Sequence, residues 1–147
     1  MDAFDADVLI YAAVAGHPLG RRVRALFALG PAARPGDVAG IGSVLLIPEL
    51  LSRPTRDHRE AEVAELAALL ARLELRPVDE ATADLAAALG ADYRLQAVDA
   101  VHLATGVLAG ADRFITNNTK DFTRSITEID VTFPTDLDDP GPQGRKR

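Results

Sequence analysis

Residues 2–13, DAFDADVLIYAA, carry the pattern that decides the fold of this chain. The apolar pair Ala3 and Phe4 predicts a short strand that ends at Asp5. The apolar run Val8–Ala15 predicts the helix that follows. The chain therefore opens as a strand that passes into a helix, with a carboxylate at the junction.

A second stretch, toward the C-terminal end, also combines a predicted helix with a predicted strand. Residues 98–118, VDAVHLATGVLAGADRFITNN, predict a helix over Val98–Ala109, a stop at Gly110 and a buried strand over Arg113–Thr116. Strands that alternate with helices indicate an α/β fold, with a central, mostly parallel sheet flanked by layers of helices.

The segments between these two stretches continue the alternation. Further helices are expected from His17-Pro18 to a stop signal at Gly30-Pro31, from Ser43 through Glu49, over Glu60–Leu73 and from Asp79 or Thr82, and further strands over Leu73–Val78 and Ile129–Phe133. Beyond Pro134 the composition changes to Asp, Pro, Gly and basic residues. We therefore expect one domain over residues 1–134 and a disordered tail over residues 135–147.

Composition limits what the domain does. The 147 residues contain no Cys, which excludes a disulfide framework, a thiol nucleophile and a Cys-ligated zinc site. The longest uncharged apolar run is far shorter than the roughly 20 residues that span a bilayer, so we expect a soluble, cytoplasmic protein. The net charge of −6 does not steer the chain toward nucleic acid. A nuclease of this composition needs a local basic rim or cations held by its own acids.

Four carboxylates fall at places where surface acids are not expected. Asp5 ends the first strand, Glu49 lies in the apolar stretch 44–51, Asp99 opens a helix with apolar inward positions, and Asp121 follows the strand near residue 115. Asp5, Glu49 and Asp99 have no Lys or Arg beside them in the sequence, whereas Asp121 follows Lys120. A carboxylate in apolar surroundings is costly unless it is paired or binds a metal. Oxygen ligands of this kind indicate Mg²⁺ or Mn²⁺.

The same stretches resemble the motifs of the PIN-domain family. Residues 5–12 (DADVLIYA) are similar to its opening motif, residues 46–51 (LIPELL) to its Glu-bearing motif, and residues 98–105 (VDAVHLAT) with 110–118 (GADRFITNN) to its last motifs. The resemblance extends over roughly residues 2–134. The short length is similar to that of VapC-type toxins of bacterial toxin–antitoxin pairs.

This resemblance implies a PIN-like three-layer fold and a metal-dependent endoribonuclease with Mg²⁺ or Mn²⁺ as cofactor. It also implies an RNA substrate, inhibition by a small antitoxin made from the adjacent gene, and a homodimer. Asp5, Asp99 and Asp121 are the expected ligands, either direct or through water, and Glu49 is a ligand or a water-orienting base. A metal held by carboxylates supplies an activated water and stabilises the leaving oxygen.

The residues on the substrate side are less closely defined. Thr116 is expected to orient the attacking water or a ligand carboxylate through its hydroxyl. Asn118 stands where many relatives place an Asp, so either Asn118 or Asp121 completes the metal site. Asp7 stands where many relatives have Asn. Arg53 is a candidate for contacting RNA phosphates, and it belongs to a basic group that a solvated turn would explain equally well: Arg53, Arg56, His58 and Arg59.

Other interpretations of the same residues remain open. Asp5 is also a suitable helix N-cap, Asp99 a first-turn acid favoured by the helix dipole, and His102 a packed core histidine. Residues 4–8 (FDADV) resemble the opening of haloacid dehalogenase-like phosphatases, with Asp138-Asp139 as their acidic pair, but the order of the later motifs fails. A PIN-like binding module without catalytic activity is the third interpretation.

Overall fold

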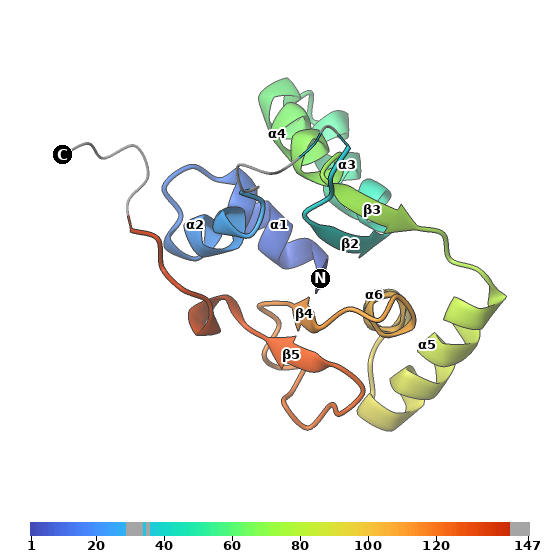
Figure 1. The fold of residues 1–147 in the computed structure, drawn as a ribbon. Coiled ribbons are helices and arrows are strands. Elements are labelled where there is room, and N and C mark those ends of the chain that lie inside the picture. Colours follow the sequence, from blue (N-terminus) through green and yellow to red (C-terminus); the bar gives the residue numbers. More distant parts are fainter. Residues whose placement is uncertain (29–33, 35, 142–147) are drawn as a thin grey trace.

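The computed structural model describes residues 1–28, 34 and 36–141 (Figure 1). The strands of this part are β1 (Asp2–Phe4), β2 (Gly40–Ser43), β3 (Leu73–Arg76), β4 (Arg113–Ile115) and β5 (Asp130–Thr132). Its α-helices are α1 (Ala6–Ala13), α2 (Pro18–Ala25), α3 (Leu46–Arg56), α4 (Glu60–Leu70), α5 (Glu80–Tyr93) and α6 (Ala97–Leu108). None of these helices combines the length and the apolar character that a membrane span requires.

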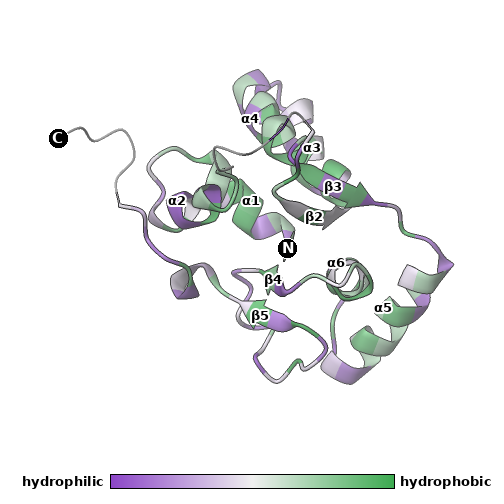
Figure 2. Cartoon of the chain, viewed as in Figure 1, coloured by the Kyte–Doolittle hydropathy of each residue, from purple (hydrophilic) through white to green (hydrophobic). Residues whose placement is uncertain are grey.

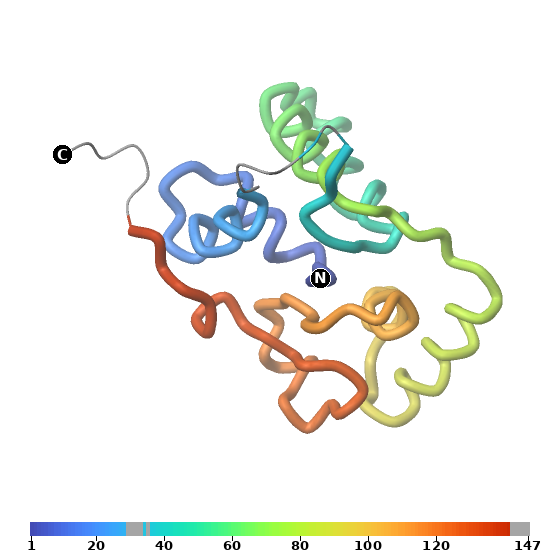
Figure 3. Tube along the Cα trace, in the orientation of Figure 1, coloured from blue at the N-terminus to red at the C-terminus, as the bar shows by residue number. Residues whose placement is uncertain are grey.

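The strands form a single sheet in the order β3-β2-β1-β4-β5, and every neighbouring pair is parallel. The prediction of a mostly parallel sheet is therefore confirmed, and all five strands are parallel. The N-terminal strand occupies the centre, where Asp2 is in register with Gly40 on one side and with Arg113 on the other. Figure 3 shows the N-terminus between the cyan segment that carries β2 and the orange segment that carries β4.

Helices cover both faces of the sheet, so the domain has three layers. Ala3 of β1 and Phe114 of β4 belong to a core formed with α5 and α6. Their neighbours Phe4 and Ile115 belong to a second core, formed with α1, α2, α3 and α4. Successive side chains of a strand point to opposite faces. In Figure 2 the hydrophobic residues of α1 and α6 mark these two layers.

The strand β2 is the element that sequence reasoning missed. Ser43 was predicted to cap a helix, but it is the last residue of β2, and α3 begins only at Leu46. The Ser43 hydroxyl instead accepts a hydrogen bond from the backbone N–H of Leu45 at 3.1 Å. A Cβ atom at Gly40 would lie 2.5 Å from the carbonyl oxygen of Asp2, so the close approach of β1 requires a glycine here.

The helix α3 is longer than predicted. It was expected to run through Glu49, but it continues to Arg56 and contains Pro54. Pro54 has no N–H to donate to the preceding turn, and it is buried. The extension places Arg53 on the same helix as Glu49, four residues later, which puts the two side chains on one face. Arg53 therefore lies on a helix rather than in a turn, and its side chain is exposed to solvent.

The segment after Pro134 was predicted to be disordered, and this is wrong for its first residues. A short 3-10 helix, η1, spans Pro134–Asp136, and the side chain of Leu137 is only 5% exposed. Arg21 of α2 donates two hydrogen bonds to the Asp139 carboxylate at 2.7 and 2.8 Å. Burial of Leu137 and this ion pair attach the segment to α2. The remainder of the tail, residues 142–147, and the predicted stop at Gly30-Pro31 lie outside the described residues.

Candidate active site

The acids singled out from the sequence gather where the central strands end. Asp5 follows β1 directly and is the N-cap of α1, while Glu49 and Asp99 lie in the first turns of α3 and α6. The pKa of Asp99 is raised, first by burial and then by the negative charges of Asp5, Asp121 and Glu49, which shows that these carboxylates lie near it. The carboxyl edge of the parallel sheet thus collects four carboxylates from four separate segments, as expected for a ligand site in this class of fold.

Asp5 is the most deeply placed of these acids. Its side chain accepts a hydrogen bond from the Thr116 hydroxyl at 2.8 Å and one from the backbone N–H of Ala6 at 2.8 Å. Burial is the main cause that raises its pKa above 3.8. The structural role of N-cap is therefore real, but a carboxylate has about four lone-pair sites, so both oxygens keep acceptor capacity for a cation or water.

Of the two roles predicted for Thr116, orienting a water or orienting a carboxylate, the structure shows the contact with a carboxylate. It follows β4 directly, its side chain is fully buried, and its hydroxyl donates to Asp5. The same oxygen accepts a hydrogen bond from the backbone N–H of Asn118 at 3.1 Å. Thr116 thus orients a carboxylate and the loop that follows, and its burial does not leave it open to contact with a substrate.

Asp7 forms a fifth carboxylate beside the first four. It lies in the first turn of α1 and accepts the backbone N–H of Asn117 at 3.1 Å. Burial, followed by the negative charges of Asp5 and Asp99, raises the pKa of Asp7 to about 7. Burial is therefore the main reason that the Asp7 carboxyl resists ionisation, and the neighbouring carboxylates add to it.

Asn118 and Asp121, the two candidates for the last acid, contact each other. The Asn118 amide nitrogen donates to the Asp121 carboxylate at 3.0 Å, and its amide oxygen accepts the backbone N–H of Asp121 at 3.1 Å. Both polar atoms of the Asn118 side chain are thus engaged in holding the loop. The Asp121 carboxylate adds to the negative field that raises the pKa of Asp99.

Glu49 has a partner that its sequence neighbours do not reveal. Its carboxylate contacts Nε2 of His102, which belongs to α6 and whose side chain is fully buried. Because a carboxylate accepts, this nitrogen carries the proton, and the other ring nitrogen, Nδ1, is buried with no hydrogen-bond partner among the residues that the structure describes. His102 is therefore packed in the core as expected, but only one of its nitrogens is satisfied. The contact holds one oxygen of Glu49 and leaves the other available.

The donor set agrees in chemistry with a hard divalent cation. All five acids present oxygen ligands, and Mg²⁺ typically uses one or two carboxylates while keeping several waters. Within the described ranges, no three His, Asp or Glu side chains are grouped closely enough to enclose an ion by themselves.

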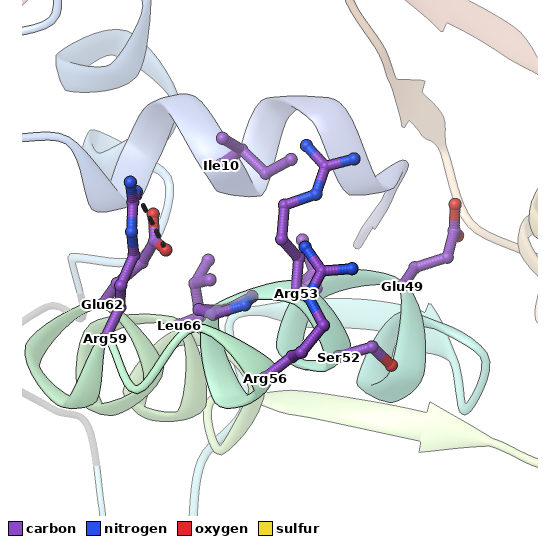
Figure 4. A pocket seen from close by; sticks show the side chains of 10 residues that line it. Ile10, Glu49, Ser52, Arg53, Arg56, Arg59, Glu62 and Leu66 are labelled. Atoms are coloured by element: carbon purple, nitrogen blue, oxygen red, sulfur yellow. Dashed lines mark ion pairs between the residues drawn. The ribbon is translucent and has the colours of Figure 1, made fainter.

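Glu49 also lines a groove (Figure 4), and none of Asp5, Asp7, Asp99 and Asp121 is among the lining residues. It has a volume of about 610 Å³ and lies between α1, α3 and α4. Its basic side chains are Arg53, Arg56 and Arg59, and its apolar ones include Ile10, Leu50 and Leu66. In the figure the guanidinium groups of Arg53 and Arg56 lie on the same side of α3 as Glu49. Of the predicted basic group, three arginines thus line one surface next to the acids.

Two residues of the site were missed as contributors by sequence reasoning. Asn117 supports Asp7 through its backbone N–H, and its amide donates to the Tyr11 hydroxyl at 3.4 Å. The role of His102 as partner of Glu49 was also missed, since 53 residues separate them. No local pattern signals a contact between helices so far apart in the chain.

Comparison with known proteins gives one family. The model of the PIN domain matches residues 3–125, which is most of the chain. A search of curated proteins finds no match.

Solved structures with the same architecture include three complexes. A toxin–antitoxin complex from Klebsiella pneumoniae is 26% identical, with a TM-score of 0.68 over 91% of this chain and 98% of that one. The complex VapBC2 from Rickettsia felis, bound to a DNA fragment from its promoter, is 17% identical. Its TM-score is 0.66, and the match covers 90% of this chain and 97% of that chain. FitAB bound to an IR36 DNA fragment is 19% identical. Its TM-score is 0.63, and the match covers 95% of this chain and 99% of that chain.

Proposed function

Because this chain belongs to the PIN domain family, we propose that it is the toxin of a toxin–antitoxin pair and acts as a metal-dependent endoribonuclease. The toxin role rests on the likeness to the Klebsiella pneumoniae complex, which covers nearly the full length of both chains. The nuclease role rests on the acids themselves. The observation that carries it is the placement of Asp5, Asp7 and Asp99 at one edge of the sheet, where burial first, and neighbouring carboxylates after it, raise the pKa of each, so that a cation bound there would offset their charge.

Asp5, Asp99 and Asp121 would hold Mg²⁺ or Mn²⁺, directly or through water, and Glu49 would serve as a further ligand or as the base that orients water. When bound, the cation activates a water and stabilises charge on the phosphate and the leaving oxygen. Thr116 fixes the carboxylate of Asp5 through its hydroxyl.

The remaining residues position these acids or the substrate. His102 of α6 contacts one oxygen of Glu49 on α3, and the second Glu49 oxygen would serve the cation or a water. Asn118 holds Asp121 through both polar atoms of its amide, which supports Asp121 as the acid of the site and Asn118 as a positioning residue. Arg53, next to Glu49 on α3, would bind an RNA phosphate with its guanidinium fork.

The proposed partners follow from the same assignment. The substrate is RNA, and the inhibitor is a small antitoxin protein from an adjacent gene. We further propose a homodimer and a cytoplasmic location, as in toxins of this type. Asp139, one of the pair that suggested a phosphatase, is bound to Arg21 on α2, so it is already neutralised by an ion pair of its own.

Cleavage of RNA by purified protein tests this function. The wild-type protein should cleave RNA in the presence of Mg²⁺ or Mn²⁺, and EDTA should abolish the cleavage. The Asp5→Asn variant should be inactive, because it keeps the shape of the side chain but removes its charge. The matched control is Asp84→Asn, which removes an exposed carboxylate from α5 and should retain full activity. Activity in Asp5→Asn, or no metal-dependent cleavage by wild type, would contradict the proposal and leave the non-catalytic binding module.

The toxin role has its own test in cells. Induction of the chain alone should arrest growth, and co-expression of the adjacent small gene should relieve the arrest. The Asp5→Asn protein should be harmless but still bind the product of that gene. A toxic Asp5→Asn variant would separate the growth effect from the carboxylates and refute the mechanism.

A further inference from the structure

The hydroxyl of Tyr11 contacts the loop that holds three of the acids. We propose that Tyr11 is a positioning residue. Through Asn117 it fixes the loop after β4 against α1, and it thereby sets how tightly the carboxyl edge binds a divalent cation. This inference rests on the proposed function, because it names a residue that supports the acids of the same site through a neighbour.

Three successive residues of the loop after β4 each donate a hydrogen bond to a different acid. The pairs are the Thr116 hydroxyl with Asp5 at 2.8 Å, the Asn117 backbone N–H with Asp7 at 3.1 Å, and the Asn118 amide with Asp121 at 3.0 Å. A shift of this loop would therefore disturb three carboxylates at once. Two of them, Asp5 and Asp121, are proposed ligands, so the position of the loop affects binding of the cation.

Asn117 joins this loop to α1 at two points. Asp7 and Tyr11 are four residues apart on α1, so their side chains lie on one face of the helix. The backbone N–H of Asn117 donates to Asp7, and its side-chain amide donates to the Tyr11 hydroxyl at 3.4 Å. Two contacts one helical turn apart fix the orientation of Asn117 along α1, which the contact with Asp7 alone does not.

The ring of Tyr11 is held by the start of α2. It stacks on the imidazole of His17, with 4.6 Å between the ring centroids and 14° between the ring planes. The imidazole is itself fixed, because its Nδ1 accepts the backbone N–H groups of Leu19 and Gly20 at 3.2 and 3.1 Å and so caps α2. A Cβ atom at Gly20 would lie 2.0 Å from the carbonyl oxygen of Tyr11, so α1 and α2 are in close contact here. The stacking restricts the ring, and the hydroxyl stays directed at Asn117.

Conservative replacement of Tyr11 tests the proposal. Tyr11→Phe keeps the ring and its stacking but removes the hydroxyl. The matched control is Tyr93→Phe on α5, which removes a hydroxyl that donates to Glu128 at 2.6 Å rather than to the loop. Binding is measured as the Mn²⁺ concentration that gives a fixed rise in melting temperature. Tyr11→Phe should need about three- to tenfold more Mn²⁺ than wild type, as expected for the loss of one neutral hydrogen bond, and Tyr93→Phe should follow wild type.

Three further readouts separate positioning from a general loss of stability. In EDTA, hydrogen exchange of the Asn117 backbone amide should be several-fold faster in Tyr11→Phe than in wild type, because its contact with Asp7 is weakened. In a double-mutant cycle, Asn117→Ala should already include most of the loss, so Tyr11→Phe added to it should raise the required Mn²⁺ by less than about twofold. With RNA, kcat of Tyr11→Phe should fall at low Mn²⁺ and recover at high Mn²⁺, while KM for RNA stays unchanged.

Three results would overturn the proposal. The first is an equal Mn²⁺ requirement in Tyr11→Phe and Tyr93→Phe. The second is additive losses from Tyr11→Phe and Asn117→Ala. The third is a raised KM for RNA in Tyr11→Phe with an unchanged Mn²⁺ requirement, which would make Tyr11 a substrate contact. A wild-type protein that binds Mn²⁺ in a Tyr11-dependent manner but does not cleave RNA would instead refute the nuclease function and support the positioning role.

Discussion

Replacement of Asp7 by Asn measures how strongly the buried Asp7 carboxylate, crowded by Asp5 and Asp99, destabilises the metal-free fold. The pKa of Asp7 rises from 3.8 to about 7, through burial first and then through Asp5 and Asp99. A carboxyl group with a higher pKa in the folded chain than in the unfolded chain resists ionisation when folded, so the unfolded state loses its proton first. Stability is therefore lost as the pH rises from about 4 to about 7, and the full penalty applies above about pH 7.

The size of the effect follows from the shift. A rise of about three pKa units corresponds to about 4 kcal/mol at 1.36 kcal/mol per unit, as an upper limit. At pH 5 the same relation leaves only about 1.7 kcal/mol of this penalty. Asn cannot ionise, and its amide oxygen can still accept the backbone N–H of Asn117. Asp7→Asn should therefore stabilise the metal-free protein more at pH 8 than at pH 5, by up to about 2.5 kcal/mol.

Urea unfolding in EDTA at both pH values provides the measurement. The free energy of unfolding is compared between wild type, Asp7→Asn and Asp84→Asn, whose exposed side chain on α5 is the control. Asp84→Asn should follow wild type at both pH values. If Asp7→Asn has the same dependence on pH as wild type, or is less stable than wild type at pH 8, burial and the neighbouring acids do not raise the pKa of Asp7 as inferred.

Three further outcomes are expected. Asp121→Asn should lower both the cleavage rate and the Mn²⁺ affinity sharply, whereas Asn118→Ala should have a milder effect; kinetics over a range of Mn²⁺ concentrations decide, and the opposite order would place the site on Asn118. His102→Ala should raise the Mn²⁺ concentration needed for thermal stabilisation, with partial recovery in His102→Gln, which can still donate to Glu49; an unchanged Mn²⁺ midpoint in His102→Ala would contradict the positioning role. Leu137→Ala should cost about 2–5 kcal/mol in urea unfolding, as for other buried leucines, and a loss below about 0.5 kcal/mol would show that the segment after Pro134 is not part of the core.

Sequence patterns predicted the elements with strong local signals. The central strand at Phe4 and the strand at Ile115 have clear apolar character, and both lie where they were expected. The strand β2 reads Gly-Ile-Gly-Ser, with one large apolar residue, so its local composition favours a turn. It is a strand because its backbone is held between β1 and β3, and its glycines meet the requirement for close approach. Tertiary pairing, which no local pattern encodes, decides its structure.

In the candidate site, too, local sequence predicted some residues, whereas others depend on how distant helices pack. Asp5 and Asp99 were predicted from their positions at the start of helices after apolar or loop segments, and the structure brings them near each other. The contact of His102 with Glu49 depends on how α6 packs next to α3, which single residues do not reveal. The exposure of Leu137 was misjudged for a related reason. A Pro- and Asp-rich segment has the composition of a tail, but one leucine and two arginines of α2 are enough to attach it.

The central place of β1 has a consequence for biosynthesis. The ribosome makes this strand first, but one of its two neighbours, β4, begins only at residue 113. The hydrogen bond between Thr116 and Asp5 spans 111 residues, so a nascent chain contains Asp5 long before the groups that complete its surroundings. Non-local pairings of this kind form late, after most of the chain has left the exit tunnel. The carboxyl edge is thus completed only when translation of the domain is nearly finished, and the nuclease proposed above would be inert until then.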